Sequence, residues 1–192
     1  MNLLFIGDVV GQSGCDFLES RMYKLKREYD IDVTVVNGEN SAQGNGITPQ
    51  SYRQLLNMGA DVVTTGNHSF RRREAEELYD TNEQLLRPAN YPEGVMGHGV
   101  TYIDMCPYKI AVVNLMGTMY MEAVENPFNY VDKLLESIDT PNIIVDFHAE
   151  ATSEKKAMGF YLQKRCTAVL GTHTHVPVSY THLRAHETLA NL

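Results

Sequence analysis

Short apolar runs alternate along the chain with segments whose apolar residues recur at helical spacing. The runs are rich in Val, Ile and Leu and predict buried β-strands within 2–7, 32–40, 61–68, 142–148 and 167–173. The amphipathic segments predict helices over 15–29, 48–60, 74–86, 127–138 and 153–165. For the second of these helices we expect Thr48 as the N-cap and Pro49 in the first position.

Residues 99–117 have a different pattern, with two apolar runs joined at Cys106-Pro107-Tyr108, which predicts a β-hairpin. Alternating strands and helices with one such hairpin indicate an α/β fold with largely parallel strands. Neither an internal repeat nor a linker interrupts the pattern, and 192 residues suit a single domain.

Polar side chains follow five of these strands directly, at the point where the chain leaves the core. They are Asp8, Glu39 with Asn40, Asn67 with His68, His148, and His173 with His175. Ligands of open α/β sheets gather at the carboxyl ends of the strands, so we expect these groups at one rim. Carboxylates, carboxamides and imidazoles together suit divalent metals, and the size of the set indicates two ions that share a carboxylate.

Taken one at a time, most of these residues could have a purely structural role instead of binding a metal. Asp8 could end a strand in a turn, Asn40 and Asn67 stand near glycines as turn formers do, and His148 could be a satisfied core histidine. The "GTHTH" segment differs, because alternate residues of an extended strand point the same way and would bring two imidazoles together. Five independent structural explanations are a poorer account than one metal site.

Composition narrows the class of function. The formal net charge of −8 offers no broad basic face for duplex nucleic acid, so an anionic substrate would need local positive charge such as metal ions. The apolar runs are too short to span a membrane, and a cytoplasmic location is the default expectation. The three cysteines (Cys15, Cys106, Cys166) are far apart, which argues against a disulfide framework and predicts buried structural thiols.

The segments "GDVVG", "NGEN", "GNH", "VDFHAEATSEK" and "GTHTHV", in this order, resemble the calcineurin-like metallophosphoesterases. Within that superfamily they are similar to the bacterial branch of 2′,3′-cyclic-nucleotide 2′-phosphodiesterases, the YmdB-like family. Val-Val after Asp8, and Glu39 in place of an aspartate, fit this branch better than the general pattern. The "SFRRRE" stretch departs from it, and Arg71, Arg72 and Arg73 read better as a solvated helix start than as phosphate ligands.

The resemblance implies a four-layer αββα sandwich around two metal ions. Ligation by Asp, Asn and His accommodates iron, manganese or zinc, and we expect iron or manganese. Glu39 would bridge the ions, and His68 would act beside them as general acid. One ion would be held by Asp8, Asn40 and His175, and the other by Asn67, His148 and His173. The reaction would be hydrolysis of a cyclic nucleotide to a 3′-nucleotide by a bridging hydroxide between ions roughly 3.5–4 Å apart. The residues that bind the substrate are not identified.

Three alternatives remain at this point. Among enzymes they are a broad-specificity phosphodiesterase and a 5′-nucleotidase; from another class, a metal-binding regulatory module with little turnover. A homo-oligomer is also left open. The resemblance covers residues 1–178, which would form a domain that is incomplete at its C-terminus. Residues 179–192 resemble a non-native, adaptor-derived tail, so we expect His182 and His186 to lie away from the metals.

Overall fold

A computed structural model describes residues 1–174, and it has a mixed α/β fold with two four-stranded sheets. The chain divides into two compact units, and each contains one sheet and its own helices. The first unit contains Met1–Arg87 and Met96–His98, and the second contains Pro88–Val95 and, within the described part of the chain, residues 99–174. The prediction of an α/β fold is confirmed. The single domain over 1–178 stays a prediction, and residues 179–192, with His182 and His186, lie outside the described residues.

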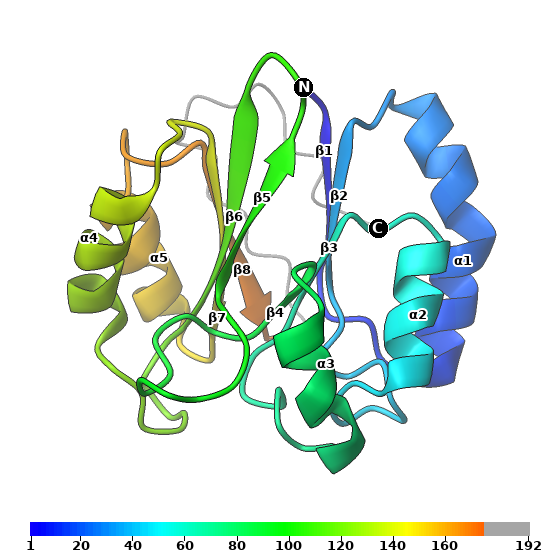
Figure 1. The fold of residues 1–192 in the computed structure, drawn as a ribbon, viewed down its shortest axis with the longest axis horizontal. Coiled ribbons are helices and arrows are strands. Elements are labelled where there is room, and N and C mark those ends of the chain that lie inside the picture. The colour runs from blue at the N-terminus through cyan, green and yellow to red at the C-terminus, as the bar shows by residue number, and fades with distance from the viewer. Residues whose placement is uncertain (175–192) are drawn as a thin grey trace. The chain divides into compact units, whose positions relative to one another are not determined.

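The sheet of the first unit is entirely parallel, in the order β1-β2-β3-β4. Its strands are β1 (Leu3–Ile6), β2 (Val33–Asn37), β3 (Val62–Thr64) and β4 (Leu85–Leu86). Its helices are α1 (Gly11–Glu28), α2 (Pro49–Asn57) and α3 (Glu76–Thr81), the last preceded by a 3-10 turn over Arg73–Ala75. Figure 1 shows α1 and α2 on one face of this sheet, where Met22 and Leu55 pack with Val36 in the core.

The sheet of the second unit has the order β5-β6-β7-β8, and only the β5–β6 pair is antiparallel. Its strands are β5 (Val100–Asp104), β6 (Lys109–Met116), β7 (Ile143–Ala149) and β8 (Ala168–His173). Its helices α4 (Pro127–Ser137) and α5 (Thr152–Tyr161) pack through Val131 and Met158 against this sheet (Figure 1). The hairpin predicted at Cys106-Pro107-Tyr108 is confirmed as the β5–β6 connection.

The start of α2 forms as its sequence predicts. The Thr48 hydroxyl accepts a hydrogen bond from the Ser51 amide, and the Ser51 hydroxyl accepts one from the Thr48 amide. This reciprocal capping box satisfies two backbone donors that a helix start leaves open, and Pro49 needs no donor of its own.

Three predicted helices differ from the structure by four residues or more at one end. The segment 74–86 is only partly helical, because the chain leaves α3 at Asn82 and Leu85–Leu86 forms a buried strand parallel to β3. The hydrophobic pattern of two leucines is compatible with a helix or a strand. In the structure they are buried and pair with β3, with Leu85 opposite Val63, so they form a strand. Helix α1 begins at Gly11, earlier than predicted, where a positive φ of 62° starts the helix without a side-chain cap. Helix α5 ends at Tyr161 rather than at residue 165.

The cysteines differ in their surroundings. Cys15 and Cys166 are buried as predicted, whereas the prediction is wrong for Cys106, which is exposed in the hairpin turn with a φ of 68°. Burial, helped by the nearby Asp16 and Glu19 carboxylates, raises the pKa of the Cys15 thiol. Burial raises the pKa of Cys166 to about 11. Both thiols therefore carry little thiolate at neutral pH.

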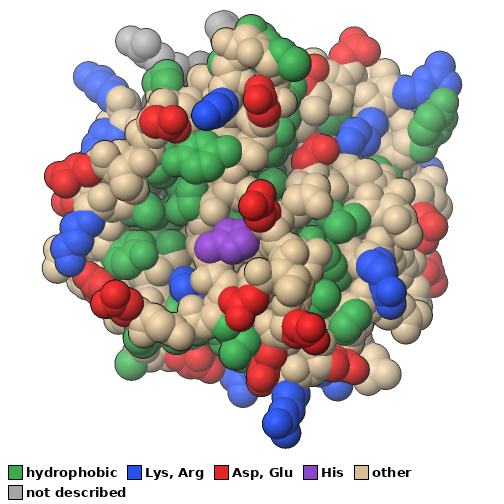
Figure 2. Space-filling model, viewed as in Figure 1, with side chains coloured by type: hydrophobic (Ala, Val, Ile, Leu, Met, Phe, Trp, Pro, Cys, Tyr) green, Lys and Arg blue, Asp and Glu red, His purple; other side chains and the backbone are tan. Residues whose placement is uncertain are grey.

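The surface shows no concentration of basic side chains on the face drawn in Figure 2, where lysines and arginines are scattered among acidic groups. This arrangement agrees with the net charge of −8. Among residues 1–174, no helix has the length and apolar character needed to cross a bilayer.

The exposure of Cys106 leads to a chemical prediction. At neutral pH, iodoacetamide should modify Cys106 rapidly, while Cys15 and Cys166 react only once the chain is unfolded, because both are buried and protonated. Peptide mass spectrometry after timed labelling measures this order. Fast labelling of Cys166 in the folded protein would contradict the packing of α5 on β8.

Candidate metal centre

In the first unit, three parallel strands end at the same edge and deliver the predicted polar side chains there. Asp8 follows β1, Glu39 and Asn40 follow β2, and Asn67 and His68 follow β3. The register aligns Ile6 with Val36 and Asn37 with Thr64, so the three chains leave the sheet together. These three strand ends therefore share one rim of their sheet.

Asn40 links the first two strand ends. Its Nδ2 donates to both carboxylate oxygens of Asp8, at 3.0 and 2.9 Å. Backbone bonds brace the same connection, since the Gly11 amide donates to the Asn40 carbonyl at 2.8 Å. The amide of Asn40 is thereby oriented, with its nitrogen toward Asp8 and its Oδ1 turned away.

Glu39 links the second strand end to the third. Its carboxylate is fully buried and accepts a hydrogen bond from the His68 amide at 3.1 Å. The His68 Nδ1 lies 3.5 Å from the other carboxylate oxygen of Glu39. Burying a carboxylate costs free energy unless hydrogen bonds or a cation compensate the charge. The buried carboxylate of Glu39 is therefore a candidate for binding a cation at this rim.

A hydrogen bond to Asn40 determines which ring nitrogen of His68 carries a proton. Nδ1 lies 2.7 Å from Asn40 Oδ1, and a carboxamide oxygen can only accept. Because the Asn40 nitrogen is already directed at Asp8, His68 Nδ1 must be the donor. Nε2 is therefore the atom that gains and loses the second proton. His68 and the adjacent Asn67 are half-buried.

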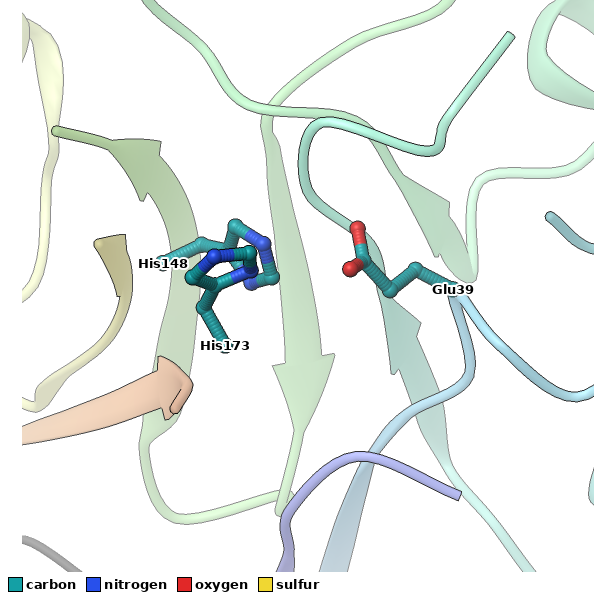
Figure 3. A group of neighbouring side chains, drawn as sticks. All are labelled: Glu39, His148 and His173. Carbon is teal, nitrogen blue, oxygen red and sulfur yellow. The ribbon is translucent and has the colours of Figure 1, made fainter. Parts of the chain in front are cut away.

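In the second unit, β7 and β8 deliver His148 and His173 to the carboxyl edge of their sheet. His148 is fully buried, and the two imidazole rings lie edge to face with centroids 4.8 Å apart. Figure 3 shows these two rings from neighbouring strands turned toward one another, and it also draws the carboxylate of Glu39. Imidazole nitrogens of two such rings are donors that suit a divalent metal.

A buried chain of hydrogen bonds lies behind the His148 ring. The Thr172 hydroxyl donates to Asp146 Oδ1 at 2.7 Å, and it lies 3.0 Å from His148 Nδ1. A hydroxyl has one proton, so with that proton on Asp146 the Thr172 oxygen must accept from His148 Nδ1. This assigns the proton of a neutral imidazole to Nδ1 and leaves the lone pair on Nε2, the form that a metal ligand needs.

His173 has a different environment from His148. Its φ is 86°, an unfavourable value for a residue with a side chain, and it ends β8. Its Nε2 lies 2.7 Å from a carboxylate oxygen of Glu150, which directly follows β7. Backbone strain of this kind persists where the surroundings demand a particular geometry, and it is common at functional sites.

A buried lysine supports the segment that follows His173. Lys155 on α5 is 1% exposed, and its Nζ donates to the Thr174 hydroxyl at 2.5 Å. Burial lowers the pKa of Lys155, while the carboxylates of Glu150 and Asp146 act in the opposite direction. Gly171 on β8 makes room for this side chain, because a Cβ there would lie 2.9 Å from Lys155 Cδ.

The structure thus brings the predicted residues together in two groups, one in each unit. Asp8, Glu39, Asn40 and His68 are hydrogen-bonded to one another, with Asn67 beside them, and His148 packs on His173. His175 lies outside the described residues. That all of these side chains serve one dimetal centre stays a prediction.

Sequence reasoning missed the supporting residues. Asp146 and Thr172 stand two and one residues before predicted ligands inside buried strands, where an acidic or hydroxyl side chain is itself a signal. The prediction that the three arginines form a solvated helix start holds for Arg71 and Arg73, which are exposed. Arg72 differs, because it donates to the carbonyl of Asn45 at 2.8 Å and stabilises the loop after Asn40.

Comparison with known proteins reveals close relatives. The family model described as YmdB-like protein matches residues 4–190. The chain is 46% identical over 178 residues to a 2′,3′-cyclic-nucleotide 2′-phosphodiesterase of Bacillus subtilis (strain 168), covering 92% of this chain and 67% of that protein. The curated relatives it matches are longer, and the chain spans 65–67% of their length.

Two solved structures are also similar. A hypothetical protein from Thermus thermophilus superposes with a TM-score of 0.88 at 40% identity, over 93% of this chain and 69% of that one. A structure described as a novel phosphatase from Mycoplasma pneumoniae gives a TM-score of 0.87 at 33% identity, over 92% of this chain and 65% of that one. These similarities confirm the fold expected from the sequence motifs.

The hydrogen bonds behind His148 predict its tautomer. In the metal-free protein, ¹⁵N-resolved NMR of the imidazole should show Nδ1 protonated, and Thr172→Val should remove that preference because valine offers no acceptor. Thr140→Val is the matched control, since the Thr140 hydroxyl donates to the Lys109 carbonyl and does not bond to His148. A Thr172→Val spectrum identical to wild type would refute the assignment.

Proposed function

The chain belongs to the YmdB-like family, and we propose that it is a metal-dependent phosphodiesterase that hydrolyses 2′,3′-cyclic nucleotides to 3′-nucleotides. The observation that carries this proposal is the two groups of oriented donor side chains at the ends of parallel strands, with Glu39, Asn40 and His148 buried. The chain that carries them is 46% identical to an enzyme named for that reaction. We propose the cytoplasm as its location and a small cyclic nucleotide as its substrate.

The donor groups fit divalent metal ions. The Nδ1 assignment places the lone pair of a neutral His148 ring on Nε2, and Glu39 and Asp8 provide carboxylate oxygens. We propose Asp8, Glu39, Asn40, Asn67, His148, His173 and His175 as ligands of two ions, iron or manganese, with Glu39 shared. When bound, two such ions would lower the pKa of water and hold phosphoryl oxygens. Their charge would also provide the local positive potential that an acidic protein otherwise lacks.

His68 is proposed as the general acid. Water adds to the phosphorus of the five-membered ring, the bond from phosphorus to O2′ breaks, and O2′ must gain a proton. Asn40 Oδ1 holds the Nδ1–H of His68, so the proton for O2′ comes from Nε2. Histidine is suited to this transfer because its ordinary pKa is near neutrality. The backbone amide of His68 donates a hydrogen bond to the carboxylate of Glu39, the proposed bridging ligand, and this bond holds the His68 backbone in place.

Product analysis tests the reaction. The chain supplied with Mn²⁺ should convert 2′,3′-cyclic AMP to adenosine 3′-phosphate, as resolved by chromatography against the 2′-phosphate isomer. His148→Ala should abolish this conversion and reduce bound metal, because it removes a ligand. Conversion that survives in His148→Ala would remove this residue from the ligand set, and formation of the 2′-phosphate would contradict the proposed bond cleavage.

The general-acid role has a separate test. His68→Gln should lower kcat on 2′,3′-cyclic AMP roughly 10²–10⁴-fold at unchanged metal content. The loss should be much smaller on bis-p-nitrophenyl phosphate, whose phenolate leaves without a proton. Equal losses on both substrates would argue that His68 acts by another route.

A further inference from the structure

The loop that follows β6 carries a highly exposed aromatic ring. It begins at Gly117, and its side chains Met119 and Tyr120 are 46% and 87% exposed. A hydrogen bond from the Met121 amide to the Thr118 carbonyl, at 3.3 Å, closes a turn with Tyr120 in its third position. Exposure of one aromatic ring is unremarkable alone, so the backbone and anchorage of this turn carry the argument.

The backbone at Tyr120 is strained. Its φ is 63°, in the left-handed region that glycine and asparagine adopt readily and bulky side chains avoid. The third position of such a turn ordinarily takes glycine for this reason. A tyrosine here gains no compensating burial, because its ring is almost entirely in solvent. Strain of this kind is a starting point for a functional hypothesis, which the anchorage and location of the turn must carry.

A buried carboxylate holds this turn in place. Glu154 on α5 is 9% exposed, and its Oε1 accepts hydrogen bonds from the Thr118 amide at 2.8 Å and the Thr118 hydroxyl at 3.2 Å. Its Oε2 accepts a third, from the Met119 amide, at 3.3 Å. Gly117 is required beside it, since any Cβ would meet the Glu154 carboxylate and the Ala149 side chain. The ring of Tyr120 is thus presented from an anchored base.

The same loop is joined directly to the histidine strand. Met116 pairs with His148 across β6 and β7, and the Gly117 amide donates to the His148 carbonyl at 2.9 Å. Tyr120 is three residues further on, so its Cα lies within roughly 10–11 Å of the Gly117 Cα by chain reach. The exposed ring is therefore carried by a loop that is hydrogen-bonded directly to the strand of His148.

We propose that Tyr120 is a stacking platform for the nucleobase of the substrate, a specificity residue of the second unit that acts beside His148. This inference rests on the proposed function, since it takes a cyclic nucleotide as the ligand. Stacking uses the face of the base and therefore tolerates any of the four bases. The chain should accept all four 2′,3′-cyclic nucleotides but disfavour a cyclic phosphate that lacks a base.

The test compares two substrates with the same reacting group. These are 2′,3′-cyclic AMP and the 2′,3′-cyclic phosphate of methyl riboside, which has no base. Tyr120→Asn, which keeps a residue suited to positive φ, should lower kcat/KM on the nucleotide roughly 5- to 100-fold, mostly through KM. It should leave the base-free substrate unchanged. Tyr120→Phe should behave as wild type on both, because it keeps the ring.

Two controls separate the ring from the fold. Phe160→Ala removes another exposed aromatic side chain, 64% exposed on α5, and should change neither substrate. Relief of strain should raise the melting temperature of Tyr120→Asn by about 2–4 °C. A lowered melting temperature, or equal losses on both substrates, would overturn the proposal by making Tyr120 structural. Unchanged activity of Tyr120→Asn on the nucleotide would overturn it too.

Failure of the proposed function gives a different result. A wild-type chain that hydrolyses neither substrate contradicts the reaction, and calorimetric binding of adenosine 3′-phosphate then tests Tyr120 alone. Binding that Tyr120→Asn loses and Tyr120→Phe keeps would support the platform. Binding that all three chains share equally, or the absence of binding to wild type, would refute it.

Discussion

Parallel pairing of β7 with its two neighbours is the constraint on which the histidine half of the site depends. The register places Met116, His148 and Thr172 on one rung. From that rung the Thr172 hydroxyl reaches the His148 ring on one side, and the Gly117 amide reaches the His148 carbonyl on the other. A slip of one residue would turn His148 to the opposite face and break both bonds, because side chains of a strand alternate in direction.

Both groups of site residues are ordered by a neutral side chain that stands between a carboxylate and an imidazole ring. In the first unit, Asn40 separates the Asp8 carboxylate from the His68 ring. In the second, Thr172 does the same between Asp146 and His148. Each of these side chains combines a donor and an acceptor, so its orientation determines which ring nitrogen carries a proton. Proton positions are therefore set before any ligand arrives, which reduces the cost of reorganisation during binding.

The sequence was a good guide to the strand ends and a poor guide to what supports them. Asp8, Glu39 and His148 were predictable because a polar residue directly after a buried run has few other uses, and Thr48 because capping follows from local chemistry. The strand at Leu85–Leu86 was not predictable, since its identity depends on pairing with β3, which only the tertiary structure supplies. Lys155 and Glu154 were hidden for the same reason: on a helix they read as solvated charges, yet both are buried.

The close approach of Gly171 and Lys155 has an evolutionary consequence. A side chain at position 171 would press on the lysine stem, so the lysine must shift if this glycine changes. Replacing Lys155 first would free the space, but it would also remove the hydrogen bond that ties Thr174 to α5. Each single change is thus harmful before the other is made. Homologous chains should carry the two positions as a linked pair, and divergence there should proceed by paired rather than independent substitutions.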